Sequence, residues 1–225
     1  MKDSESRIVP STHDLETVVR FLKYVFQLKD IVRQGWNYEY IDADGVARQR
    51  QVDNPESDGD HKFGLAIGVL TLGLLYRLPM DVIFRAMILA IIHDLPELIV
   101  GDTVTATKVG QDFIAVRRQK EIAETVAMQH ICYDHLPRDI ADFFMEAWQE
   151  YEAGITEAAK LVKSLDKIDF TLQSINYLEQ DCNVSPERYL GNAVNKLTHE
   201  ATFGIPDILS EMIAEVREKQ YGVID

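Results

Sequence analysis

Residues 87–102 read MILAIIHDLPELIVGD and carry the pattern that decides the fold. The run up to His93 is strongly apolar, with a spacing that predicts a buried helix. His93 and Asp94 stand at the end of this helix, Glu97 follows four residues after His93, and Asp102 lies in the turn beyond. Polar groups at the end of an apolar helix need partners, because burying a carboxylate without compensation is costly.

Helical patterns also cover most of the remaining chain. They occupy residues 15–31, 61–76, 80–95, 111–132, 137–151, 156–179, 186–200 and 206–219. Residues 36–52 contain Asp44-Gly45 between residues of partial strand character, which indicates a hairpin or an extended loop. We therefore expect a single all-α domain over residues 1–225, with a short hairpin or loop insert near residues 37–54.

Composition and charge exclude several classes of protein. The chain has 225 residues, 46% of them hydrophobic, and a formal net charge of −14, which repels long nucleic acids. No apolar run approaches the ~18–20 residues that cross a bilayer, and the polar N-terminal stretch lacks a signal-peptide core. Two cysteines cannot form a disulfide framework. We expect a soluble cytoplasmic protein without a membrane partner.

Two further segments place chemistry-bearing residues in helices. Residues 55–61 read PESDGDH and put His61 at the start of an apolar helix. Residues 160–169 read KLVKSLDKID and put Asp166 among apolar residues, on a helix face that it shares with Asp169. A histidine or an aspartate alone in such a place is more often a satisfied structural residue than a metal ligand. These two segments can supply the further ligands that a metal ion beside His93 and Asp94 would need.

The motifs, taken in order, resemble the HD-domain metal-dependent phosphohydrolases. His61, then His93-Asp94, then Asp166 follow the order that this family uses. The surrounding Pro-Glu-Ser-x-x-Asp-His, His-Asp-Leu-x-Glu-x-x-x-Gly-Asp and Leu-Asp-Lys-Ile are similar to the branch that contains the deoxynucleoside 5′-monophosphatases. Residues 33–36, Arg-Gln-Gly-Trp, precede them as in that branch. The resemblance covers about residues 15–180 and implies an HD-domain helical bundle, with a C-terminal helical extension over 185–225.

The resemblance also implies a ligand set for one divalent metal ion. Its ligands would be His61, His93, Asp94 and Asp166, while Asp169 is an alternative one helical turn away from Asp166. Mixed imidazole and carboxylate ligation suits Co²⁺, Mn²⁺, Ni²⁺, Fe²⁺ or Zn²⁺ better than Ca²⁺, and Mg²⁺ stays open. Such an ion lowers the pKa of a water molecule and polarises a phosphate oxygen.

Five further residues receive roles by resemblance or by position. Glu97 is the candidate acid/base or water-orienting group, and Asp102 is expected to position the substrate and the leaving group. Arg33 is expected to contact the phosphate, since a guanidinium is a planar, permanently charged fork. Trp36 is expected to pack against the nucleoside, and Lys108 is a second candidate phosphate contact.

We expect a phosphohydrolase that acts on small nucleotides, most readily a (deoxy)nucleoside 5′-monophosphatase, and the resemblance implies a homodimer. Two alternatives stay open. The same site could act on a nucleoside triphosphate, a cyclic nucleotide or a guanosine alarmone, or the chain could be a regulatory protein that binds metal or nucleotide without turnover. The insert at residues 37–54, which is longer than in the relatives, leaves the substrate open.

Overall fold

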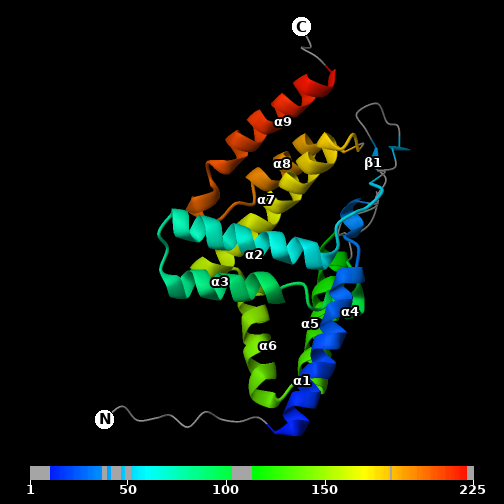
Figure 1. Cartoon of the computed structure of the whole chain (residues 1–225), viewed down its shortest axis with the longest axis vertical. Coiled ribbons are helices and arrows are strands. Elements are labelled where there is room, and N and C mark those ends of the chain that lie inside the picture. The colour runs from blue at the N-terminus through cyan, green and yellow to red at the C-terminus, as the bar shows by residue number, and fades with distance from the viewer. Residues whose placement is uncertain are drawn as a thin grey trace.

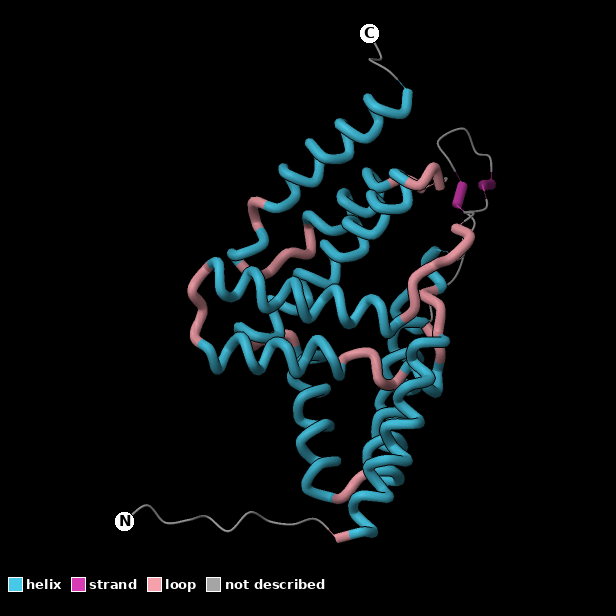
Figure 2. The backbone as a smooth tube through the Cα atoms, viewed as in Figure 1, coloured by secondary structure: helices cyan, strands magenta, loops and turns pink. Residues whose placement is uncertain are grey.

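Helices form nearly all of the regular structure in the computed structural model, which describes residues 11–36, 40–41, 47–48, 52–102, 113–182 and 184–221 (Figures 1 and 2). The α-helices are α1 (Thr12–Val25), α2 (Asp58–Leu75), α3 (Met80–Ile92), α4 (Glu97–Val100), α5 (Phe113–His135), α6 (Arg138–Ala153), α7 (Glu157–Glu179), α8 (Pro186–Val194) and α9 (Ile205–Tyr221). Short 3₁₀ helices are η1 (Phe26–Asp30), η2 (Gln34–Trp36) and η3 (Glu200–Thr202). The all-α prediction is confirmed.

Helix α7 forms the centre of the bundle. It packs against α2, α3, α6, α8 and α9, and Figure 1 shows it running behind the side-by-side pair α2 and α3. Its inward face is apolar, with Leu161, Val162, Leu165 and Ile168 each no more than 5% exposed. Burial of this face on several sides is a large stabilising contribution, since each such side chain contributes roughly 1.5–3 kcal/mol. Asp166 lies within this buried stretch, so the core fixes its position.

The insert near residues 37–54 contains a short hairpin. Strands β1 (Tyr40–Ile41) and β2 (Ala47–Arg48) pair antiparallel, with Tyr40 opposite Arg48 and Ile41 opposite Ala47. Asp44-Gly45, which carries the turn signal in the sequence, lies outside the described residues. In Figure 2 these strands lie at one edge of the molecule, outside the helical bundle.

Several helix ends differ from the predicted ones because of local capping. The first helix begins at Thr12, earlier than predicted, because Ser11 and Asp14 form a reciprocal capping box. The helix predicted to reach about residue 95 ends at Ile92, and a turn separates it from α4, which begins after Pro96. Proline lacks the amide hydrogen that a continuous helix would need there. Among the described residues, no helix combines the length and apolar composition of a membrane span.

Candidate metal centre and active site

The start of α2 positions His61. Ser57 caps the helix by accepting a hydrogen bond from the Asp60 amide, and the Asp60 carboxylate accepts one from the Ser57 amide in return. An isolated antiparallel bridge joins Val32 to Ser57, and the Asp58 amide donates to the Ile31 carbonyl at 2.9 Å. This short pairing brings the segment that carries Arg33 against the first turn of α2. The Pro-Glu-Ser-x-x-Asp-His motif is therefore a capped helix start that places His61 in the interior.

The end of α3 positions His93 and Asp94. The His93 amide closes the last helical turn by donating to Leu89, and the chain then turns into α4. His93 Nε2 lies 2.8 Å from Asp94 Oδ2, while His61 Nε2 lies 3.8 Å from the same oxygen. Asp166 on α7 completes the group, with its Oδ1 3.3 Å from His61 Nε2. Four side chains from α2, α3, the following turn and α7 thus meet at one point.

The two histidines present unused nitrogen atoms to this meeting point. His61 Nδ1 contacts Asp169 Oδ2 at 2.6 Å, and His93 Nδ1 contacts the Ala90 carbonyl at 3.0 Å. Both Nε2 atoms are buried and, among the described residues, make no well-aligned hydrogen bond; they face carboxylate oxygens of Asp94 and Asp166 at 2.8 and 3.3 Å. An acceptor at Nδ1 fixes the tautomer that leaves the Nε2 lone pair available, which is the usual arrangement of a metal-ligating histidine.

The charges at this point also fit a divalent cation. Burial opposes ionisation of Asp94 and Asp166, but the neighbouring His93 and Lys167 respectively outweigh burial and hold the pKa of each carboxyl below its usual value. Burial also opposes protonation of His61, yet Asp166 and Asp169 raise the pKa of its imidazole to about 9. The carboxylates of Asp166 and Asp169 therefore favour a positive charge at the buried imidazole of His61. A divalent ion held by imidazole and carboxylate ligands would supply that charge, so the residues fit a metal ion.

Glu97 faces a second buried carboxyl group that the sequence did not single out. Glu97 is 6% exposed and Asp58 is fully buried, and ligand atoms of Asp58, Asp94 and Glu97 lie within 4.8 Å of one another. Burial, together with the negative charges of Asp94 and Asp58, raises the pKa of the Glu97 carboxyl well above its usual value. Asp58 stands at a variable position of the Pro-Glu-Ser-x-x-Asp-His motif, so spacing could not reveal it. Glu97 is therefore placed to hold a proton beside the candidate metal ligands.

Arg33 and Asp102 lie next to the same group. The Arg33 guanidinium is 4.0 Å from carboxylate oxygens of Asp94, Asp166 and Glu56. Asp102 follows Gly101, whose φ of +70° suits glycine, and its Oδ2 accepts a hydrogen bond of 2.6 Å from the Gln34 amide. Asp102 thus ties the turn after α4 to the segment that carries Arg33.

Trp36 lies behind Arg33 and does not reach the cavity surface. Its side chain is fully buried, stacks on Phe170 at 4.1 Å between ring centroids, and donates a hydrogen bond of 3.0 Å to Glu56. In this arrangement the Trp36 side chain has no exposed surface with which to make the expected contact with a nucleoside. Glu56 was also missed by the sequence analysis, although it belongs to the Pro-Glu-Ser motif. Lys108, the other candidate phosphate contact, lies outside the described residues.

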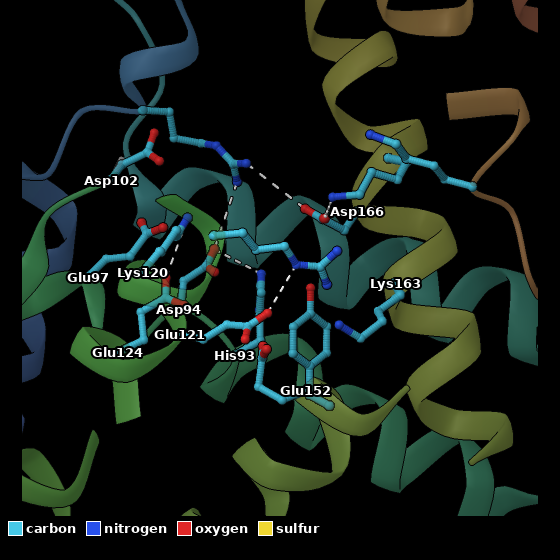
Figure 3. A pocket seen from close by; sticks show the side chains of 15 residues that line it. His93, Asp94, Glu97, Asp102, Lys120, Glu121, Glu124, Glu152, Lys163 and Asp166 are labelled. Carbon is cyan, nitrogen blue, oxygen red and sulfur yellow. Dashed lines mark hydrogen bonds and ion pairs between the residues drawn. The ribbon is translucent and has the colours of Figure 1, made fainter. Parts of the chain in front are cut away.

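A cavity of about 580 Å³ opens beside these side chains (Figure 3). His93, Asp94, Glu97 and Asp166 face it together in the figure. The other walls are rich in charged side chains from α5, α6, α7 and the segment after α8, namely Arg117, Lys120, Glu121, Glu124, Glu152, Lys163, Lys167 and Lys196. The cavity is therefore polar, and its volume is in the range of small-molecule sites.

The HD domain family matches residues 25–208 of the chain. The chain belongs to the HD-domain family. The match includes α8 and the beginning of α9, so it runs beyond the residues that carry the motifs. The predicted resemblance to this family is confirmed.

Similar proteins include several named 5′-deoxynucleotidases. The chain is 32% identical to 5′-deoxynucleotidase HDDC2 of Homo sapiens over 208 residues, which cover 91% of this chain and 89% of that protein. It is 34% identical to 5′-deoxynucleotidase HDDC2 of Xenopus laevis, over 73% of this chain and 71% of that protein. It is 30% identical to 5′-deoxynucleotidase hdd1 of Schizosaccharomyces pombe, over 72% of each.

Solved structures share the fold. An HD-domain phosphohydrolase from Listeria innocua superposes with a TM-score of 0.64 at 15% identity, over 90% of this chain and 95% of that one. A predicted metal-dependent phosphohydrolase from Magnetospirillum magnetotacticum superposes with a TM-score of 0.59 at 22% identity, over 92% and 97%. These likenesses agree with the all-α HD bundle.

Proposed function

We propose that this chain is a metal-dependent phosphohydrolase that releases phosphate from (deoxy)nucleoside 5′-monophosphates. The observation that carries the proposal is the convergence of His61, His93, Asp94 and Asp166 on one point beside the cavity, where two buried Nε2 atoms face carboxylate oxygens. These four residues would hold one divalent ion. The similarity to proteins named 5′-deoxynucleotidases, over most of both chains, supports the choice of substrate.

The neighbouring side chains have complementary roles in this proposal. A bound divalent ion supplies Lewis-acid polarisation of the phosphate and makes water more acidic. Arg33 would bind the phosphate oxygens, because its guanidinium already lies 4.0 Å from Asp94 and Asp166. Glu97 would exchange a proton through Oε2, which is buried and has no hydrogen-bond partner among the described residues. Asp102 lines the same cavity and would orient the substrate and its leaving oxygen.

Trp36 and Lys108 have less direct roles in the proposed binding of substrate. The buried indole of Trp36 would act through Glu56, which it holds beside Arg33 by a hydrogen bond. It is then a positioning residue for the phosphate contact. Lys108 remains our candidate for a second contact from the segment that follows Asp102.

We also propose that the chain is one HD domain over residues 1–225 and forms a homodimer. The core would span about residues 15–180, with a C-terminal helical extension over 185–225. Helices α2 and α3 each expose a stripe of large apolar side chains at the spacing i, i+4, i+11, and exposed apolar patches of this kind mark interfaces. The stripes consist of Phe63, Ile67 and Leu74 on α2 and Met80, Phe84 and Ile91 on α3. Equilibrium sedimentation of wild-type protein and the Phe63→Ser variant tests this, with a dimer and a weaker dimer expected.

The same proposal places the protein in the cytoplasm, acting on small molecules. Both cysteines, Cys132 and Cys182, are free thiols, as a reducing compartment favours. The net charge of −14 continues to argue against long nucleic acids as partners.

The proposed function is tested by phosphate release from a panel of nucleotides. Metal-stripped protein is supplied with Mg²⁺, Mn²⁺, Co²⁺, Ni²⁺, Fe²⁺ or Zn²⁺ separately and given ribo- and deoxynucleoside 5′-monophosphates, triphosphates, a cyclic nucleotide and a guanosine alarmone. We expect inorganic phosphate from monophosphates, loss of activity in Asp94→Asn, and full activity in Asp139→Asn, which changes an exposed aspartate on α6. Release of triphosphate or pyrophosphate would favour the other HD hydrolases. Tight nucleotide binding without any product would favour a regulatory protein.

A further inference from the structure

Lys163 is a cation of the cavity wall to which no role has yet been given. It lies on α7, three residues before Asp166, so both side chains project from the same face of the helix. Its ammonium nitrogen stands 4.2 Å from the centre of the Tyr151 ring, and that ring lies 4.8 Å from the ring of His93. Lys163 thus contacts Tyr151, which in turn contacts the candidate metal ligand His93. Figure 3 shows Lys163 among the side chains that line the cavity.

The end of α6 is shaped to accommodate the Lys163 stem. Gly154 ends this helix in the left-handed conformation, with a φ of +63°. A Cβ atom added there would stand 3.1 Å from both Cδ and Cε of Lys163. The glycine thus serves the turn and also leaves room for the lysine stem, while Tyr151 supports the charged end. The side chain is held in a defined place between α6 and α7.

The other cations of the cavity already have carboxylate partners, with one exception. Arg117 pairs with Glu121 at 3.0 Å, Lys120 pairs with Glu124 at 3.4 Å, and Lys167 pairs with Asp166 at 2.5 Å. Among the residues that the structure describes, no carboxylate lies within ion-pair distance of Lys163 or of the exposed Lys196. Of these two, only Lys163 is half-buried beside the metal ligands. A half-buried ammonium group that has three hydrogen-bond donors and contacts only an aromatic ring among these groups can bind an anion.

We infer that Lys163 is a substrate-binding residue, whose ammonium group binds the phosphate of the substrate from the α6–α7 side of the cavity. This rests on the proposed function in that the substrate is taken to be a phosphate monoester. Such a group carries nearly two negative charges at neutral pH. Arg33 supplies one positive charge from the segment before η2, and Lys163 supplies a second from another wall. The exposed carboxylate of Glu152 also attracts this ammonium, and a bound phosphate has to compete with that weak attraction.

The inference is tested by binding of inorganic phosphate, the product of the reaction. The Lys163→Met variant keeps an unbranched stem against Gly154 and Tyr151 and removes the charge. Calorimetric titration of Co²⁺-loaded protein with inorganic phosphate should show binding weakened about 10- to 100-fold in this variant, which corresponds to one lost hydrogen bond to a charged group. Lys163→Arg should recover part of the affinity. Lys160→Met, an exposed lysine on the same helix, should bind phosphate like wild type.

Metal affinity and kinetics separate this role from a structural one. Competition with a chelator should give the same Co²⁺ affinity for Lys163→Met and wild type, and the KM for a deoxynucleotide should rise more than kcat falls. Phosphate binding that is equal in Lys163→Met and wild type overturns the inference, as does wild-type protein that binds no phosphate. If phosphate binding depends on Lys163 while no deoxynucleotide is hydrolysed, the inference stands and the proposed substrate is wrong. If deoxynucleotides are hydrolysed with an unchanged KM, the proposed function stands and the inference fails.

Discussion

Replacing Gly35 with alanine should destabilise the protein, because the site behind Arg33 has no room for a methyl group. A Cβ atom at Gly35 would stand 2.6 Å from Cζ and 3.2 Å from Cε2 of Phe170. The ring cannot move aside easily, since it stacks on Trp36 at 4.1 Å and contacts Tyr189 at 4.8 Å. The alanine therefore has to displace a packed aromatic cluster or its own backbone.

The size of the effect follows from two opposing contributions. Overpacking of a well-packed interior costs about 1–3 kcal/mol. Alanine restricts the unfolded chain and returns about 0.4–1 kcal/mol where its backbone conformation is allowed, as it is at Gly35, whose φ is not positive. Taking the middle of each range, we expect a net loss of about 1.3 kcal/mol in the free energy of unfolding. The KM for substrate should also rise, because the Arg33 guanidinium lies 5.4 Å above the Phe170 ring.

Gly191 provides the matched control for this prediction. It lies inside α8, and a Cβ atom there would meet nothing within 4 Å. Gly191→Ala should therefore stabilise the protein by about 0.5–1 kcal/mol, the helical preference of alanine over glycine. Urea unfolding of the two variants and wild type, compared at equal m-values, measures both changes. The reasoning is refuted if Gly35→Ala unfolds at the same or a higher urea concentration than Gly191→Ala.

Three further predictions concern the metal centre and the thiols. Stripping the divalent ion should lower the free energy of unfolding by about 2.7 kcal/mol, relative to protein with free metal at a hundred times the Kd, and Asp94→Ala should show no such loss. Calorimetric scans with and without metal measure the change, and equal curves for wild type would contradict it. Asp169→Asn should weaken metal binding about 10- to 100-fold, because it disturbs the hydrogen bond to His61 Nδ1, whereas Asp139→Asn at an exposed position should not. Competition with a chelator measures both metal affinities, and equal values for Asp169→Asn and wild type would contradict the prediction. Native protein should be alkylated at Cys182 before Cys132, because Cys132 is fully buried whereas Cys182 is partly exposed, and burial raises the pKa of both thiols, that of Cys132 to about 12. Both thiols should react after unfolding. Mass spectrometry that finds both labelled equally fast in native protein would speak against this.

Local pattern predicted the helices well and their ends less well. The apolar spacing of residues 80–95 predicted a helix, and the helix is there, but it ends at Ile92 because Pro96 removes an amide donor and a new short helix begins. The helix predicted over 186–200 ends at Val194. Periodicity reports which face of a segment is buried, whereas helix ends depend on individual hydrogen bonds at the caps.

The motif order singled out the four candidate metal ligands, which the fold brings together, but their supporting partners come from other helices. Spacing within one helix cannot show that Asp169 on α7 holds His61 on α2, or that Asp58 faces Glu97. Trp36 was expected at the nucleoside from the resemblance of residues 33–36 to the related branch, yet the packing of α7 buries it against Phe170. Such cross-helix pairings are set by the tertiary fold.

The central claim is that the buried His-Asp cluster holds one divalent ion on which phosphate release depends. It is tested most directly by titrating Co²⁺ into metal-stripped protein while visible absorbance and phosphate release from a deoxynucleoside 5′-monophosphate are followed on the same samples. We predict that absorbance and turnover rise together and saturate at one ion per chain, and that Asp94→Ala shows neither. Phosphate release without added metal, or a saturated Co²⁺ spectrum with no release from any nucleotide, would contradict the account.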